Sequence, residues 1–350
     1  MREIVIVIAD LYLPRGEDAA HARAGVAAGT APGIEYAGRF GERAALADGW
    51  RAWLAGRIGR ADLAAVAPAR IAAAACPGTQ ATAWIATPVQ LVADLTRVHL
   101  QPQGILRLPA AQLAELAASF KGAFGGSGLA LHPLPCGEFL LFTAGMPPLA
   151  TLEPARAAGA DLAQSLPHGP QAAALRRLGA EIEMWLHGES VNATRVQRGE
   201  APVTSLWLWG SAGAQGAPGA PQRAAGESVT AASSAPRAFG SDAWLDGMWR
   251  LQKRACEALP PRLPADHRTQ DLEVWVVEVR AELAAGGGPP ALAQALAQLD
   301  ARFISPALEV LKAGGAQLVT LLANDTRVTL GRRSGRRFWR RARPGIGCFL

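Results

Sequence analysis

Cysteines are few in this chain, and their spacing argues against two classes of site. Cys76, Cys136, Cys256 and Cys348 lie far apart and form no Cys-x-x-Cys pair. A disulfide framework or a zinc knuckle needs closer, paired cysteines, whereas isolated thiols fit the reducing cytoplasm. We therefore expect a cytoplasmic protein.

Long apolar runs are also missing. No uncharged apolar stretch reaches the roughly 18 residues that a bilayer-spanning helix requires. The short run in MREIVIVIADLYLP meets Asp10 too early for a signal peptide and lacks a small-residue cleavage site. We expect a strand there and no transmembrane segment.

Several common active-site motifs are absent from the sequence. It contains no Walker-type phosphate loop, no Rossmann GxGxxG fingerprint and no Ser-His-Asp signature. These absences disfavour P-loop enzymes, Rossmann-type dinucleotide-binding enzymes and serine hydrolases.

Positive charge is concentrated near the C-terminus. The formal net charge is +6, but residues 332–343, RRSGRRFWRRAR, hold seven arginines and no acid, so the rest of the chain is close to neutral. Arginines with Phe338 and Trp339 among them suit phosphates or an anionic membrane surface. The alternative is a basic extension that lies on an acidic face of its own fold.

Strand and helix patterns alternate in the first and last parts of the chain. The β-branched run Ile4–Ile8 is typical of a buried parallel strand. Further buried strands are predicted at 205–209, 272–279 and 317–323. Helical patterns cover 42–75 in two pieces, 242–259 and 290–312. This order predicts an α/β fold with a mostly parallel sheet.

The middle of the chain has the pattern of a small α+β unit. The predicted elements are a hairpin turning near Gln103-Gly104, a helix at 110–121, strands at 129–131 and 138–142, and a helix at 171–187. We expect residues 91–189 to form a smaller domain inserted into a discontinuous core of residues 1–90 and 190–350. Within that core, residues 211–240 are rich in Gly, Ala, Pro and Ser and are expected to be a flexible loop.

Asp10 directly follows the first predicted strand. Open α/β sheets place their sites at the carboxyl ends of the strands, which makes Asp10 a candidate for chemistry. The alternative is that its carboxylate caps the following loop or helix.

One segment, ESVNATRVQRGEAPVTSLWLWGSAG at 189–213, resembles a motif of a known family. Archaeal-type cofactor-independent phosphoglycerate mutases, which belong to the alkaline phosphatase superfamily, carry HPxNxxRxxxGxxPANxIxxxGxG. The matching residues are Asn192, Arg195, Gly199, Pro202 and Gly210. The preceding SLPHGP at 165–170, which contains His168, is similar to the DPH element of that family.

Weaker similarities cover most of the chain. IVIVIAD, LEVWVVEVRAELAAGGG and AQLVTLLAND resemble core strands of the family. A proteobacterial branch described both as phosphoglycerate mutase and as a regulatory protein of the RpfE type shares SLWLWG, the glycine-rich loop and an Arg- and Trp-rich C-terminus. The resemblance implies an alkaline-phosphatase-like core with an inserted α+β domain.

The resemblance also implies site residues, but the metal ligands are incomplete. Asp10 and Asp325 stand where metal ligands are expected, and Thr79 stands near the place of the Ser nucleophile, although Thr in a Pro-Gly turn is usually a turn residue. Two metal ions need roughly six Asp and His ligands. The expected acidic run is replaced by AELAAGGG, where Glu282 is the one candidate, and no His follows Asp325.

Asn192, Arg195, Arg198 and His168 form a candidate face for a phosphorylated or anionic ligand, because arginine donates forked hydrogen bonds to such groups. The alternative is that the arginines pair with nearby acids and that Trp207 and Trp209 fill the core.

Three hypotheses follow. The first is a catalytically degenerate phosphoglycerate-mutase-like protein that needs no cofactor and acts as a regulatory or binding protein. The second is an active mutase or phosphatase that uses Mn or Zn at a reorganised site drawn from Asp10, Glu278, Glu282, Asp325 and His267. In the third, the arginine-rich segment binds nucleic acid or an acidic partner.

Overall fold

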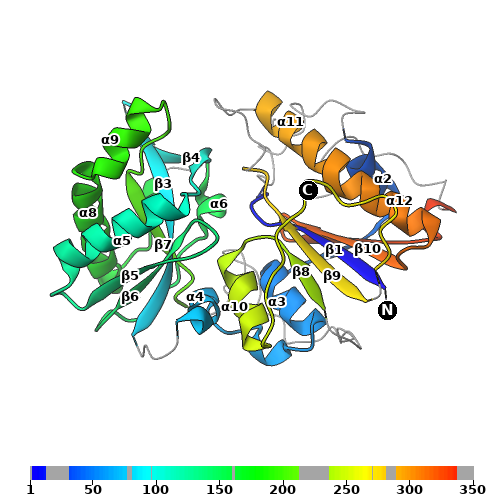
Figure 1. The fold of residues 1–350 in the computed structure, drawn as a ribbon, viewed down its shortest axis with the longest axis horizontal. Helices are drawn as coiled ribbons and strands as arrows, with labels where there is room; N and C mark the ends of the chain where they lie inside the picture. Colours follow the sequence, from blue (N-terminus) through cyan, green and yellow to red (C-terminus); the bar gives the residue numbers. More distant parts are fainter. Residues whose placement is uncertain are drawn as a thin grey trace. The chain divides into compact units, whose positions relative to one another are not determined.

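The chain folds into two compact units (Figure 1). One unit comprises Met1–Ala64, Gly216–Gly240 and Cys256–Leu350, and the other comprises Ala65–Gln215 and Ser241–Ala255. The computed structural model describes residues 2–12, 31–76, 81–95, 97–159, 162–212, 236–269, 271–280 and 289–336. Among these residues, no helix is both long and apolar enough to cross a membrane.

The first unit is built on a six-stranded sheet in the order β2-β11-β10-β1-β9-β8. Its strands are β1 Glu3–Ile8, β2 Glu42–Ala45, β8 Arg237–Phe239, β9 Leu272–Val277, β10 Leu318–Ala323 and β11 Thr326–Gly331. β1 pairs in parallel with β10 and β9, and β9 pairs in parallel with β8. β1 is buried along its whole length, which explains its continuous β-branched sequence.

Helices cover both faces of this sheet. The helical segments are α2 Pro32–Phe40, α3 Gly49–Arg57, the 3-10 turns Ala61–Leu63 and Ser334–Arg336, α11 Pro289–Leu299, the π-helical turn Asp300–Ile304 and α12 Ser305–Ala313. α2, α11 and α12 lie on one face and α3 on the other (Figure 1). On the α3 face, Arg57 donates from Nε to the buried Glu3 carboxylate at 2.9 Å, so this contact holds the helix to the central strand.

The second unit contains a five-stranded antiparallel sheet around the long strand β3 Thr82–Ala93. Its other strands are β4 Val98–Ile105, β5 Leu129–Pro133, β6 Phe139–Thr143 and β7 Ser205–Trp209. β3 pairs with β4, β6 and β7, and β5 pairs with β6.

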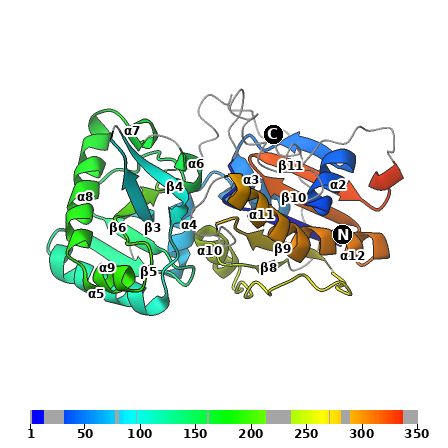
Figure 2. The ribbon, with the colours of Figure 1, turned by 90° about the horizontal axis from the view of Figure 1, so that it is seen from above.

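The helical segments of this unit are α4 Pro68–Ala72, the 3-10 turn Ala73–Ala75, α5 Ala110–Phe124, α6 Pro154–Ala157, α7 Leu162–Ser165, α8 Pro170–His187, α9 Ser190–Gln197 and α10 Ala243–Leu251. α6 and α7 lie on one side of the sheet, and α5 and α9 on the other (Figure 2). Leu178, Ile182 and Leu186 recur at helical spacing on α8 and pack with Trp84 and Phe120 into one core.

The predicted α/β class is confirmed, with a mostly parallel sheet in one unit and an α+β arrangement in the other. The predicted insert, residues 91–189, is shorter than the second unit, which comprises Ala65–Gln215 and Ser241–Ala255. β7 pairs with β3 in the antiparallel sheet, so the expectation that 205–209 joins the parallel core is wrong. A long apolar run shows that a strand is buried but does not show which sheet it joins.

Three local predictions are also wrong. The hairpin expected near Gln103-Gly104 is a single strand, β4. Residues 42–45 form β2 instead of the start of a helix. Part of the loop expected at 211–240 is the strand β8, whereas 213–235 lie outside the described residues.

We predict that Gly247→Ala destabilises the protein. A Cβ at Gly247 in α10 would lie 2.2 Å from the carbonyl oxygen of Ile71 in α4, where backbone must shift to make room. Overpacking of this kind costs about 1–3 kcal/mol. Gly179→Ala is the matched control, because its Cβ meets nothing within 4 Å and α8 should gain about 0.5–1 kcal/mol. Urea unfolding of both variants measures the difference, and equal midpoints would contradict the packing of α10 on α4.

Candidate functional site at the carboxyl edge of the parallel sheet

The carboxyl ends of three parallel strands bring polar residues together in the first unit. Asp10 follows β1, Glu278 follows β9 and Asn324 follows β10. The backbone N–H of Asn324 donates to the carbonyl of Leu11 at 2.9 Å, which joins the ends of β10 and β1. This is the edge at which open α/β sheets place their sites.

The Asp10 carboxylate is held by backbone donors from the neighbouring strand. Oδ1 accepts the N–H of Val279 at 2.6 Å, and Oδ2 accepts the N–H of Arg280 at 2.9 Å. Asp10 therefore caps the segment after β9, whereas the sequence suggested a cap on the segment after β1.

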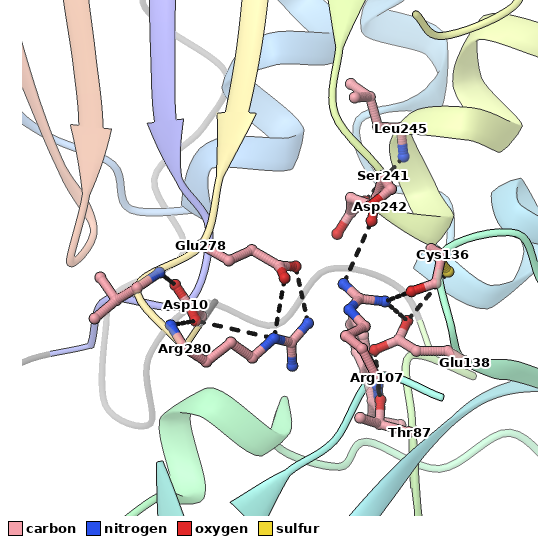
Figure 3. A network of polar contacts seen from close by, with 12 residues as sticks. Asp10, Thr87, Arg107, Cys136, Glu138, Ser241, Asp242, Leu245, Glu278 and Arg280 are labelled. Atoms are coloured by element: carbon pink, nitrogen blue, oxygen red, sulfur yellow. Dashed lines mark hydrogen bonds and ion pairs between the residues drawn. The ribbon is translucent and has the colours of Figure 1, made fainter. Parts of the chain in front are cut away.

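Arg280 neutralises the carboxylates at this edge (Figure 3). Its Nε and Nη2 donate to the two oxygens of Glu278 at 3.1 and 2.8 Å, and its Nε lies 4.0 Å from Oδ2 of Asp10. The side chains are 9% exposed for Arg280, 7% for Asp10 and 15% for Glu278. The forked geometry is the strong form of an arginine–carboxylate pair.

Burial and the nearby Glu278 raise the pKa of Asp10 from 3.8 to about 6. The charge of Arg280 and the two backbone hydrogen bonds lower that pKa, but they do not fully offset the cost of burying a charge. Asp10 therefore exchanges its proton near pH 6.

The described residues do not fit a two-metal site. Both oxygens of Asp10 accept backbone hydrogen bonds, and both oxygens of Glu278 accept hydrogen bonds from Arg280. No group of three or more His, Cys, Asp or Glu within the described ranges has the arrangement of a metal site. Glu282 lies outside those ranges.

Asp325 has a structural role in a hairpin turn. Ala323 and Thr326 are paired residues of β10 and β11, so Asn324 and Asp325 form a two-residue turn between them. Their φ angles are 48° and 56°, which is the conformation that Asn and Asp tolerate in such turns.

His267, a candidate ligand for a reorganised site, lies at the other end of β9. Its Nε2 is 2.5 Å from Oε2 of Glu273, near the start of that strand. Glu273 and Glu278 are five residues apart, which is roughly 16 Å along a strand. His267 therefore does not join Asp10 and Glu278.

Asn192 and Arg195, expected to face a ligand, hold the turn between α9 and β7. Asn192 donates from Nδ2 to the carbonyls of Leu186 and Val203 and accepts the Val203 N–H at Oδ1, each at 2.8 Å. The Arg195 side chain is 7% exposed. It donates to the Ala201 carbonyl and to Gln112, and it pairs with Glu200 at 3.1 Å.

Two further candidates have exposed side chains. Arg198 is exposed at the end of α9, and His168 is exposed just before α8. Asn192 contacts Leu186, which is 16 residues from the start of α8, or about 24 Å along that helix. His168 therefore lies far from Asn192. Thr79 lies outside the described residues.

The role of Arg280 was not predicted from the sequence. The available signal was its position two residues after Glu278, directly beyond a buried strand. An acid and an arginine two positions apart at a strand end can meet, as they do here. Their spacing did not reveal that Asp10, some 270 residues away in sequence, shares the arginine.

The second unit contains another buried polar cluster that the sequence did not reveal (Figure 3). Glu138, 4% exposed, accepts the Thr87 hydroxyl at 3.0 Å and pairs with Arg107 at 3.4 Å. Arg107 also donates to the backbone carbonyls of Cys136 and Ser241. Burial, and then the charge of Glu138, raise the pKa of the Cys136 thiol far above its usual range, which opposes formation of the reactive thiolate.

Comparisons with known proteins found distant structural similarities and no sequence match. No family model and no curated protein matches the chain. The solved structure of the cofactor-independent phosphoglycerate mutase from Thermoplasma acidophilum DSM 1728 has a TM-score of 0.36 and 16% identity, and covers 94% of this chain and 89% of its own. The PH0037 protein from Pyrococcus horikoshii has a TM-score of 0.44 and 12% identity, covering 94% and 87%. At these scores no residue role is transferred from either structure.

We predict that Asp10→Asn flattens the pH dependence of stability. Because the native pKa lies above the unfolded value, the native state binds this proton more tightly. That stabilisation is fully present below about pH 4 and is lost as pH rises through 6, up to about 3 kcal/mol. Urea unfolding between pH 4 and 7 measures the slope for both proteins, and an identical slope would show that Asp10 does not titrate in this range.

We predict that Arg280→Met destabilises the protein by about 3–5 kcal/mol at pH 7, because buried carboxylates lose their counter-charge. The loss should shrink at pH 5, where Asp10 is protonated. Arg333→Met, at an exposed arginine, is the control and should change stability by less than about 0.5 kcal/mol. Equal effects of the two variants would contradict the ion pair.

Proposed function

We propose that this chain is a catalytically degenerate relative of the archaeal-type cofactor-independent phosphoglycerate mutases, and that it acts as a cytoplasmic binding or regulatory protein. The segment at 189–213 supports the relationship. One observation carries the loss of catalysis: the guanidinium of Arg280 engages the carboxylates at the sheet edge where metal ions would need free oxygens.

Charge explains why this arrangement opposes two-metal chemistry. Two divalent ions would add four positive charges beside a guanidinium that stays protonated at all relevant pH values. Asp10 and Glu278 supply at most two negative charges, and their oxygens already have donors. Metal binding would have to displace Arg280 and the backbone donors together.

The ligand class follows from the same relationship. We propose that the chain is related to the RpfE-type branch and binds a phosphorylated or otherwise anionic molecule. Asn192 and Arg195 are occupied in the α9–β7 turn, so Arg198 and His168 are the exposed members of the predicted set. His168 precedes α8, whereas Arg198 follows α9, so the two residues belong to different elements.

The test is elemental analysis after incubation with Mn²⁺ or Zn²⁺ and desalting, with a phosphoglycerate mutase assay on the same sample. We expect far less than one ion per chain and no turnover. Arg280→Met provides the comparison, because removal of the guanidinium should increase metal retention without creating turnover. About two ions per chain together with turnover in the unaltered protein would establish an active enzyme with a reorganised metal site and overturn the proposal.

A further inference from the structure

A pocket of about 220 Å³ lies in the second unit beside β7. Its wall includes the four consecutive strand residues Ser205–Leu208, the residues of α8 around Gly179, and Thr151. Apolar side chains dominate the wall, with Arg176 and Glu183 on α8 among its few charged residues. A volume of this size holds a side chain somewhat larger than benzene.

The pocket lies at the edge of β7. Side chains of successive strand residues point to opposite faces of a sheet. Leu206 and Leu208 pack into the core with α5 and α8, whereas Trp207 donates from Nε1 to the carbonyl of Leu152 at 2.8 Å. A space that touches residues pointing to both faces must lie at the strand's edge.

β7 itself is buried, but no further strand pairs with its outer edge in the described part of the chain. The N–H of Leu106 donates to the Pro88 carbonyl at 2.9 Å, which places the main-chain groups of Pro88 on the β4 side of β3. The groups of Thr87 therefore point to β7, where Thr87 is opposite Trp207. Leu206 and Leu208 flank Trp207, so their N–H and C=O groups point outward, and within the described ranges β7 pairs with β3 alone.

Other features of the pocket wall suit a peptide, whose main chain is polar and whose side chain can be apolar. The hydroxyl of Thr151 is buried and has no hydrogen-bond partner among the described residues. The small residues Gly179 and Ala180 leave space on the α8 side of the pocket. A Cβ added at Gly179 would meet nothing within 4 Å. Arg176 uses Nη1 to hold the Pro167 carbonyl at 2.8 Å, and its side chain is exposed.

We propose that this groove binds a short peptide segment in an extended conformation, which adds a strand to the outer edge of β7. Main-chain groups of the peptide pair with Leu206 and Leu208, and one apolar side chain enters the pocket. Arg176 and Glu183 are seven residues apart on α8, about 10 Å, which corresponds to three residues of extended chain. The charges therefore select a peptide with an acidic residue at one end of this span and a basic residue at the other.

This proposal is independent of the loss of metal chemistry. The pocket residues belong to the second unit, whereas Asp10, Glu278 and Arg280 belong to the first. Failure of either proposal leaves the other unaffected, since the metal assay does not involve the groove and the peptide experiment does not involve the carboxyl edge.

A displayed library of random eight-residue peptides, selected on the full chain, tests the proposal. We expect selected peptides to combine an apolar residue with flanking acidic and basic residues. Their binding, measured by fluorescence anisotropy with synthetic peptides, should fall at least tenfold with Gly179→Phe, which fills the groove. Gly179→Ala adds only a methyl group and should leave binding within about twofold. Circular dichroism confirms that both variants keep the fold.

Two further comparisons separate strand addition from other modes of binding. N-methylation of alternate peptide residues removes main-chain donors and should weaken binding at least tenfold. Arg176→Glu should weaken binding of acidic peptides, whereas Arg177→Glu, the adjacent exposed arginine outside the pocket, should not. The proposal is overturned if no peptide is enriched over the Gly179→Phe variant, or if N-methylated peptides bind as tightly as the unmodified ones.

Discussion

The contact of Arg280 with the carboxylates of Glu278 and Asp10 determines what the carboxyl edge of the parallel sheet can do. Buried carboxylates require donors or a counter-charge, because removing an ion from water costs several kcal/mol. Here the chain supplies both from one short segment after β9, through the guanidinium of Arg280 and the backbone N–H groups of Val279 and Arg280. The same contacts tie the end of β9 to the end of β1.

The buried carboxylate of Glu138 in the second unit is held in a similar way. Glu138 is held by Thr87 and Arg107, and Arg107 reaches the carbonyl of Ser241. This contact helps to explain why residues 241–255 belong to this unit, although the preceding strand β8 lies in the other. The side-chain amide of Asn192, which precedes β7 in sequence, likewise donates to backbone carbonyl groups.

These examples show how far the sequence predicted the fold and the site. The strand at Ile4–Ile8 and the helices at 110–121 and 171–187 follow from local periodicity, and the structure has them at nearly those positions. The candidate site was predicted less well. Asp10 was correctly placed at a strand end, but the polar atoms of Asn192 and Arg195 are occupied by groups up to 83 residues away. A motif gives the residue types and does not reveal these partners.

The sequence by itself determined which segments are buried, because apolar periodicity sets the free energy of burying each face of a strand or helix. The wide spacing of its four cysteines also argued against a disulfide framework. Only the tertiary structure decided that β7 joins β3, that Arg280 neutralises Asp10, and that a pocket lies beside β7. These features depend on hydrogen-bond and charge partners distant in sequence, and such pairings leave no periodic signal along the chain.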